Sequence, residues 1–163
     1  MAKVVLREIN KEIWPRCMEL TLKLEQGGLV APNFYRVHEF KAEPQFIQVA
    51  IFDGEEMVGY AMYGVDPDDG KYWIYRLMID IDHQRMGYGK AALEEIIKVL
   101  SDQPGCDEIF VGYRPENFVA HAMYLSAGFK RTGSMLQGEY IARLDVKELK
   151  AQVETEEARL AAS

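Results

Sequence analysis

The chain has few of the residues that build metal sites and disulfide frameworks. Its 163 residues include three histidines, His38, His83 and His121, which are scattered without metal-ligand or catalytic-triad spacing. The two cysteines, Cys17 and Cys106, are far apart in the sequence, which favours reduced thiols. We therefore expect no metal site and no disulfide.

Long hydrophobic runs and an excess of positive charge are also absent. No apolar run approaches the roughly 20 residues that span a bilayer, and Met1-Ala2-Lys3 leads into polar sequence without the core of a signal peptide. The formal net charge of -7 disfavours a polyanionic partner such as nucleic acid and favours small cations. We expect a cytoplasmic protein that binds neither membranes nor nucleic acid.

The sequence does contain enough apolar residues for one hydrophobic core. Hydrophobic residues make up 48% of the chain, and we find no internal repeat and no second domain. We expect one domain over residues 1–146. The charged, Ala- and Glu-rich tail, residues 147–163, is expected to be either an exposed helix or disordered.

Hydrophobic periodicity predicts a mixed order of strands and helices, and hence an α/β (α+β) fold class. Period-two alternation between turn residues predicts strands over residues 3–9, 45–52, 57–65, 71–80, 109–113, 129–134 and 139–145. Apolar residues three or four apart predict helices over residues 13–24, 91–100 and 117–127. The aromatic segment 32–44 is irregular and could hold a short further helix that lines a pocket.

The most informative stretch is Gln84-Arg85-Met86-Gly87-Tyr88-Gly89-Lys90, which joins a predicted strand to a predicted helix. Gly87 and Gly89 let the backbone turn tightly and approach a ligand, while the new helix offers unpaired N–H groups and the positive end of its dipole. The spacing excludes a P-loop, which needs four residues between its glycines and a hydroxyl residue after the lysine. We expect this turn to bind phosphate groups.

The same turn also matches the dinucleotide-binding pattern GxGxxA, from Gly87 to Ala92. That pattern requires an acidic residue at the far end of the next strand, but Asp107 and Glu108 lie at the beginning of that strand instead. Three predicted antiparallel strands also precede the turn, where a parallel βαβ unit would be expected. A nucleotide-binding oxidoreductase module is therefore a less favoured alternative.

A second pattern follows, with an asparagine, a short helix and a Gly-Phe pair. It reads NFVAHAMYLSAGF from Asn117 to Phe129. Asn117, Ala120 and Tyr124 are spaced i, i+3 and i+7 and so share one stripe of the helix. A side chain as small as Ala120 would let a ligand lie against the helix, and Tyr124 could point at its reactive end. The alternative is that Asn117 only caps the helix and Tyr124 is a core residue.

The two patterns together resemble the GNAT family of N-acetyltransferases. The family's acyl-CoA loop has the form Q/R-x-x-G-x-G/A, which Gln84, Gly87 and Gly89 match, and the Asn-helix-Gly-Phe pattern is its second signature. The resemblance covers residues 4–146. It implies a single-domain GNAT fold, with a mixed central sheet of about seven strands whose fourth and fifth strands splay apart, flanked by about four helices.

The resemblance further implies direct transfer of an acetyl group from acetyl-CoA to an amine, without an acyl-enzyme. A backbone amide near Met78 would polarise the thioester carbonyl, and Tyr124 would protonate the departing thiolate. These two are the expected catalytic residues. The expected cofactor-binding residues are Leu77, Met78, Ile79, Gln84, Arg85, Met86, Gly87, Tyr88, Gly89, Lys90, Asn117, Ala120 and Tyr124.

Within the family, residues 59–64, 73–76 and 78–80 are most similar to bacterial spermine/spermidine acetyltransferases. Some polyamine acetyltransferases carry acids where this chain has Tyr75 and Arg76, so an antibiotic, an amino acid or a peptide N-terminus stays an alternative acceptor. A catalytically silent CoA-binding sensor is an alternative function. The partner is thus a small-molecule amine, and a homodimer is a candidate assembly because dimers are common in the family. Candidate substrate residues, including the base that accepts the amine's proton, are Glu25, Asp66, Tyr75 and Asp80.

Overall fold

The computed structural model describes residues 2–26 and 46–162, and for residues 21–26 the backbone alone. Its strands are β1 (Val5–Glu8), β2 (Phe46–Asp53), β3 (Glu56–Val65), β4 (Tyr72–Ile79), β5 (Glu108–Tyr113), β6 (Lys130–Leu136) and β7 (Glu139–Asp145). Its helices are α1 (Trp14–Gln26), α2 (Tyr88–Ser101), α3 (Phe118–Ser126) and α4 (Val146–Ala161), with a short 3-10 helix η2 (Ile81–His83). The predicted elements within these residues agree to within a few positions at each end, and segment 32–44 lies outside the described residues.

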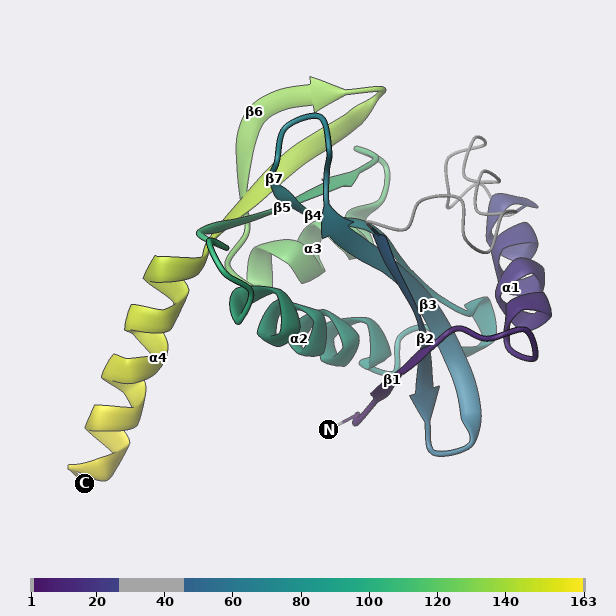
Figure 1. Cartoon of the computed structure of the whole chain (residues 1–163), viewed down its shortest axis with the longest axis horizontal. Coiled ribbons are helices and arrows are strands. Elements are labelled where there is room, and N and C mark those ends of the chain that lie inside the picture. Colours follow the sequence, from purple (N-terminus) through teal and green to yellow (C-terminus); the bar gives the residue numbers. More distant parts are fainter. Residues whose placement is uncertain (1, 27–45, 163) are drawn as a thin grey trace.

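The strands form one sheet of seven, in the order β1-β2-β3-β4-β5-β7-β6 (Figure 1). Neighbouring strands are antiparallel except for β4 and β5, which are parallel and joined through α2. A parallel pair needs such a crossover, because the chain must return to the same end of the sheet. The mixed seven-stranded sheet with its helices confirms the expected fold class.

The central strands β4 and β5 separate partway along their length. Their pairing ends at Ile74 with Val111, so residues 75–79 of β4 have β3 on one side and no strand on the other. A register shift in β3 between Met62 and Tyr63 also places a β-bulge in β4 at Tyr75. The expected splay of the fourth and fifth strands is confirmed, and we call this opening the fork.

Each face of the sheet carries its own hydrophobic core. On the face that we call the α2 face, α2 buries Leu93, Ile96 and Leu100, which recur at the helical period. On the α1 face, α1 buries Cys17 and Leu20. Complete burial of an aliphatic side chain contributes about 1.5–3 kcal/mol. The two cores therefore hold the central strands, and with them the fork, in place.

The C-terminal tail is a helix that projects away from the body (Figure 1). Asp145 caps α4, since its Oδ1 accepts a hydrogen bond of 3.0 Å from the N–H of Glu148. Val146 is buried, whereas residues 150–162 are exposed. None of the helices among the described residues is long and apolar enough to cross a bilayer.

Candidate active site

The glycine turn between β4 and α2 has a backbone conformation that few side chains favour. Arg85 (φ 65°) and Gly87 (φ 84°) both lie in the left-handed region. Gln84 fixes the start of the turn, because its Nε2 donates a hydrogen bond of 3.1 Å to the carbonyl oxygen of Ile79. Left-handed residues in a turn direct backbone N–H groups toward a common point, a geometry that binds anions.

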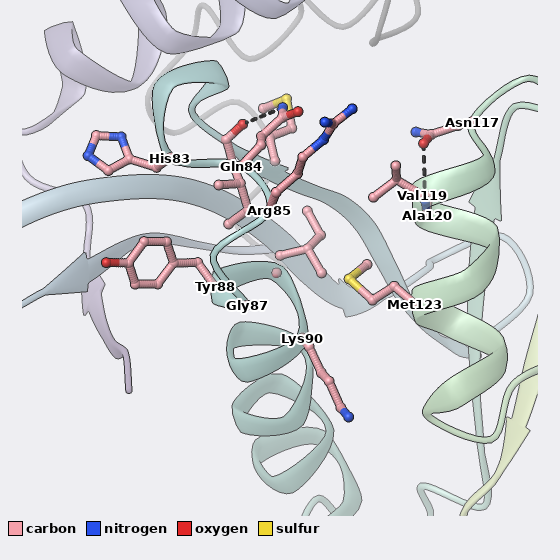
Figure 2. Close-up of a pocket in the computed structure, with 14 residues that line it drawn as sticks. His83, Gln84, Arg85, Gly87, Tyr88, Lys90, Asn117, Val119, Ala120 and Met123 are labelled. Atoms are coloured by element: carbon pink, nitrogen blue, oxygen red, sulfur yellow. Dashed lines mark hydrogen bonds between the residues drawn. The ribbon is translucent and has the colours of Figure 1, made fainter. Parts of the chain in front are cut away.

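The helix α2 begins directly after this turn. Gly87 is its N-cap residue and makes no side-chain hydrogen bond to the amides of the first turn. The side chain of Tyr88 points away from α3 (Figure 2), and its hydroxyl donates a hydrogen bond of 2.5 Å to Oδ2 of Asp53. That bond raises the pKa of the Tyr88 phenol. Tyr88 therefore anchors the helix start from the side opposite α3.

The opposite wall is α3. Oδ1 of Asn117 accepts a hydrogen bond of 3.1 Å from the N–H of Ala120, so Asn117 caps the helix, and Gly128 (φ 105°) follows its end. Met123 points from α3 toward the cavity (Figure 2). A Cβ added to Gly89 would lie 3.1 Å from Sδ of Met123, so the glycine allows α2 and α3 to approach closely.

A cavity of about 440 Å³ lies between the glycine turn, α3 and β4 (Figure 2). Two expected cofactor residues do not line it: Met86, which is 56% exposed, and Tyr124, which is buried. His83, Val119 and Met123 line it and were not expected. The expected residues that do line it are Leu77, Met78, Ile79, Gln84, Arg85, Gly87, Tyr88, Gly89, Lys90, Asn117 and Ala120.

The backbone of β4 past the fork adds a second set of polar groups to the cavity. The N–H of Asp80 donates a hydrogen bond of 2.8 Å to the carbonyl of Val58 in β3, and such bonds recur at every second residue of an antiparallel pair. Met78 therefore directs its amide toward β3, while Leu77 and Ile79 direct theirs to the fork. The expected amide near Met78 is thus corrected to one of its two neighbours.

The aromatic ring of Tyr124 lies in the core beside the fork. It packs against Tyr113 and Phe129, with ring centroids 5.6 Å and 5.5 Å away. Burial raises the pKa of the Tyr124 phenol above its usual range, so the group keeps its proton at neutral pH. Among the described residues the hydroxyl has no hydrogen-bond partner.

The expected substrate residues lie in separate places. The hydroxyl of Tyr75 donates a hydrogen bond of 2.5 Å to Oδ2 of Asp66, so these two form a pair. Asp80 lies at the other end of β4, where its Oδ2 is 3.4 Å from Nδ1 of His83. Glu25 belongs to the last turn of α1, and its side chain is outside the described residues. The structure therefore brings together two of the four.

The α1 face carries a chain of aromatic side chains around this pair, which we call the aromatic wall. Phe46, Tyr75, Trp73 and Phe110 contact one another in that order, with ring centroids 4.3, 6.2 and 5.2 Å apart. Ile74, which alternates with Trp73 and Tyr75, packs into the core on the α2 face. Sequence reasoning found only Tyr75, because the wall combines residues from three strands.

His83 is a cavity-lining residue that sequence reasoning did not find. Its Nε2 lies 2.8 Å from Oε1 of Glu56, in addition to the contact of Nδ1 with Asp80. The hydrogen bond with Glu56 is the main cause of a raised pKa, which burial opposes. Val119 and Met123 could have been found from their positions beside Ala120, whereas the contact of His83 with a distant strand leaves no local signal.

Comparison with known proteins was made for sequence and for structure. Residues 6–129 match the model of the acetyltransferase (GNAT) family. The spermine/spermidine N(1)-acetyltransferase of Bacillus subtilis is 32% identical over 108 residues, which cover 62% of this chain and 69% of that protein. The ribosomal protein bS18-alanine N-acetyltransferase of Escherichia coli is 26% identical over 106 residues, 65% of this chain and 70% of that protein.

Solved structures share the fold. The spermidine N-acetyltransferase from Vibrio cholerae, in complex with CoA and spermine, has a TM-score of 0.70 at 13% identity, and the match covers 86% of this chain and 93% of that chain. The cavity fits the same cofactor, since it joins an anion-binding turn to the free backbone groups at the fork. The family model matches most of the length, and the chain therefore belongs to the GNAT family and is an N-acetyltransferase that uses acetyl-CoA.

Proposed function

We propose that this enzyme transfers an acetyl group directly to a primary amine of a polyamine such as spermidine or spermine. The observation that carries the proposal is the 32% identity to the spermine/spermidine N(1)-acetyltransferase of Bacillus subtilis. Fold likeness alone would leave the acceptor open, because one fold serves many substrates. The chemistry of the α1 face supplies a second, independent argument.

The α1 face at the start of β4, before the fork, suits a cation. Asp66 and Asp69 accept hydrogen bonds from Tyr75 (2.5 Å) and Trp73 (3.0 Å), so carboxylates lie along the edge of the aromatic wall. Ammonium groups bind both carboxylates and aromatic faces. A net charge of -7 would also attract such a ligand over longer distances. A polyamine, with several ammonium groups along an apolar chain, matches these features.

On the cofactor side the residues have separable tasks. We infer that the glycine turn and the first amides of α2 bind the pyrophosphate, with Arg85 and Lys90 adding positive charge. Acetyl-CoA supplies the thioester that the amine attacks. The amides of Leu77 and Ile79 can stabilise the negative charge that develops on the thioester oxygen. Tyr124 can donate its proton to the departing sulfur.

A peptide N-terminus is the second candidate acceptor. Arg76 lies in β4 at the fork on the α1 face, where a guanidinium would repel an ammonium ion but would bind main-chain carbonyl groups. The relative from Escherichia coli is named for an alanine of a ribosomal protein. This pairing of observations favours a peptide over an antibiotic or a free amino acid as the alternative.

A thiol-release assay with acetyl-CoA separates the candidates. The purified protein would be assayed with spermine, spermidine, simple diamines, aminoglycosides and short peptides with free N-termini. Turnover with spermine and spermidine, well above that with the peptides, is the expected result. Turnover with peptide N-termini and none with polyamines would contradict the proposal and support the second candidate.

A further inference from the structure

Glu139, the first residue of β7, places its carboxylate over the backbone of β5 at the fork. β7 lies beside β5 in the sheet (Figure 1). Gly112 pairs with Ile141. A Cβ added to Gly112 would lie 3.2 Å from Oε1 of Glu139 and 3.6 Å from its Cδ. Gly112 is also the first residue of β5 past the last pair with β4. The carboxylate therefore occupies the space that a side chain at position 112 would fill.

The carboxylate and the Tyr124 phenol approach the fork from opposite faces of the sheet. Val111 and Tyr113 pack into the core on the α2 face, so Gly112, which lies between them, faces the other side. The ring of Tyr113 stacks on that of Tyr124 at 5.6 Å. Glu139 thus lies on the acceptor side, against the same short segment of β5 that supports the phenol on the cofactor side.

The carboxylate of Glu139 can take a cation as a partner. Its side chain is half-buried, and among the described residues it has no ion pair and no hydrogen-bond donor. Its charge does act at longer range. It raises the pKa of Tyr124, second to burial, and it raises the pKa of Arg76, which burial lowers. A half-buried carboxylate that has no ion pair among the described residues is stabilised by an incoming ammonium group, and its attraction for Arg76 offsets part of the repulsion between that guanidinium and the ammonium group.

We propose that Glu139 binds the ammonium group of the acceptor and accepts the proton that the nitrogen must lose before it attacks. The inference rests on the proposed function, because it needs an acceptor that arrives protonated. One proton passes from nitrogen to the carboxylate, which frees the lone pair. The C–N bond then forms while the C–S bond breaks, and sulfur takes the proton of Tyr124. The nitrogen's remaining extra proton passes to the Tyr124 phenolate, and Glu139 releases its own to solvent.

The test is the pH dependence of kcat/KM for Glu139→Gln with spermidine. At pH 7 the variant should lose about 100-fold, the lower end of the usual contribution of a general base. The loss should shrink toward pH 10, where much of the free amine has already lost its proton. The Kd for acetyl-CoA should not change. A merely structural role would give a loss that is the same at every pH, and that result would overturn the inference.

A second variant and a control distinguish a loss of catalysis from a folding defect. In Gly112→Ala the new Cβ would push the carboxylate away by a few tenths of an ångström, so a smaller loss with the same pH dependence is expected. Glu116→Gln, on the exposed loop before α3, should keep full activity. If another amine is the substrate, polyamine specificity fails, and the same pH comparison with that amine decides the role of Glu139. If the wild-type protein acetylates no amine at all, both proposals fall.

Discussion

The cofactor side and the acceptor side of the fork are built in different ways. On the cofactor side a short contiguous turn, from Gln84 to Lys90, presents backbone amides whose directions follow from two left-handed residues. On the side that we propose for the acceptor, the side chains come from four strands: the aromatic wall from β2, β4 and β5, and Glu139 from β7. A site built from backbone amides tolerates substitution of most of its side chains. A site built from side chains is altered by each substitution.

This difference separates chemistry from specificity. Backbone amides at a helix start bind any diphosphate in the same way, so the cofactor is a property of the fold. Carboxylates and aromatic rings on strand surfaces can be exchanged without changing the sheet, so the acceptor is a property of the individual protein. Substitutions should therefore affect the two substrates independently.

The largest expected effect comes from Gly87→Val. A β-branched residue at φ 84° is strained, and the turn must change to relieve it. Loss of two charge-assisted hydrogen bonds of about 2 kcal/mol each would raise the Kd for acetyl-CoA about 1,000-fold. Isothermal titration calorimetry measures this directly.

The matched control is Gly105→Val. Gly105 has φ 73° and open space around its Cβ position, and it lies beyond the opposite end of α2. It should lower the melting temperature by a similar amount but leave acetyl-CoA binding intact. Equal Kd values for the two variants would mean that the glycine turn does not bind the cofactor.

The next largest effect is expected for Tyr124→Phe. The ring contacts with Tyr113 and Phe129 would stay, so the fold and the Kd for acetyl-CoA should not change. The kcat should fall about 100-fold, as for the loss of a general acid. Tyr113→Phe removes a hydroxyl that bonds Nδ1 of His121 at 2.8 Å, outside the cavity, and should keep its kcat. Full turnover in Tyr124→Phe would remove its catalytic role.

The sequence predicted the cofactor side far better than the acceptor side. The glycine turn and the helix positions Asn117 and Ala120 are local patterns, and all of these residues except Met86 line the cavity. The amides that face the fork belong to the neighbours of Met78. This could be found only from the pairing of β4 with β3, because the sequence of one strand does not show which of its amides bond the next strand. Glu139 gave no signal, because its place at the fork depends on the pairing of β7 with β5.

A smaller effect, confined to the acceptor, is expected for Asp66→Asn. The change removes one charge beside the aromatic wall but keeps an oxygen that can accept from the N–H of Asp68 (2.7 Å). The KM for spermidine should rise about fivefold, or about 1 kcal/mol, with an unchanged KM for acetyl-CoA. Asp68→Asn, in the same turn but exposed, is the control. Equal KM values for spermidine in the two variants would place the acceptor elsewhere.

The smallest effect concerns stability and belongs to the cofactor side. The pKa of His83 is raised in the folded protein, chiefly by its hydrogen bond with Glu56, so the protonated form favours folding. This contribution is complete below the unfolded pKa of about 6.5 and is lost as the pH rises through the folded pKa. Between pH 6 and pH 8 the wild-type protein therefore loses this stabilisation, and its melting temperature falls. In His83→Gln the fall in melting temperature over the same pH range should be smaller by about 1–2 °C. His121→Gln, which removes an imidazole that bonds the hydroxyl of Tyr113 at 2.8 Å, is the control. Identical pH dependence in all three proteins would show that the contact between His83 and Glu56 contributes nothing to the stability of the cavity's edge.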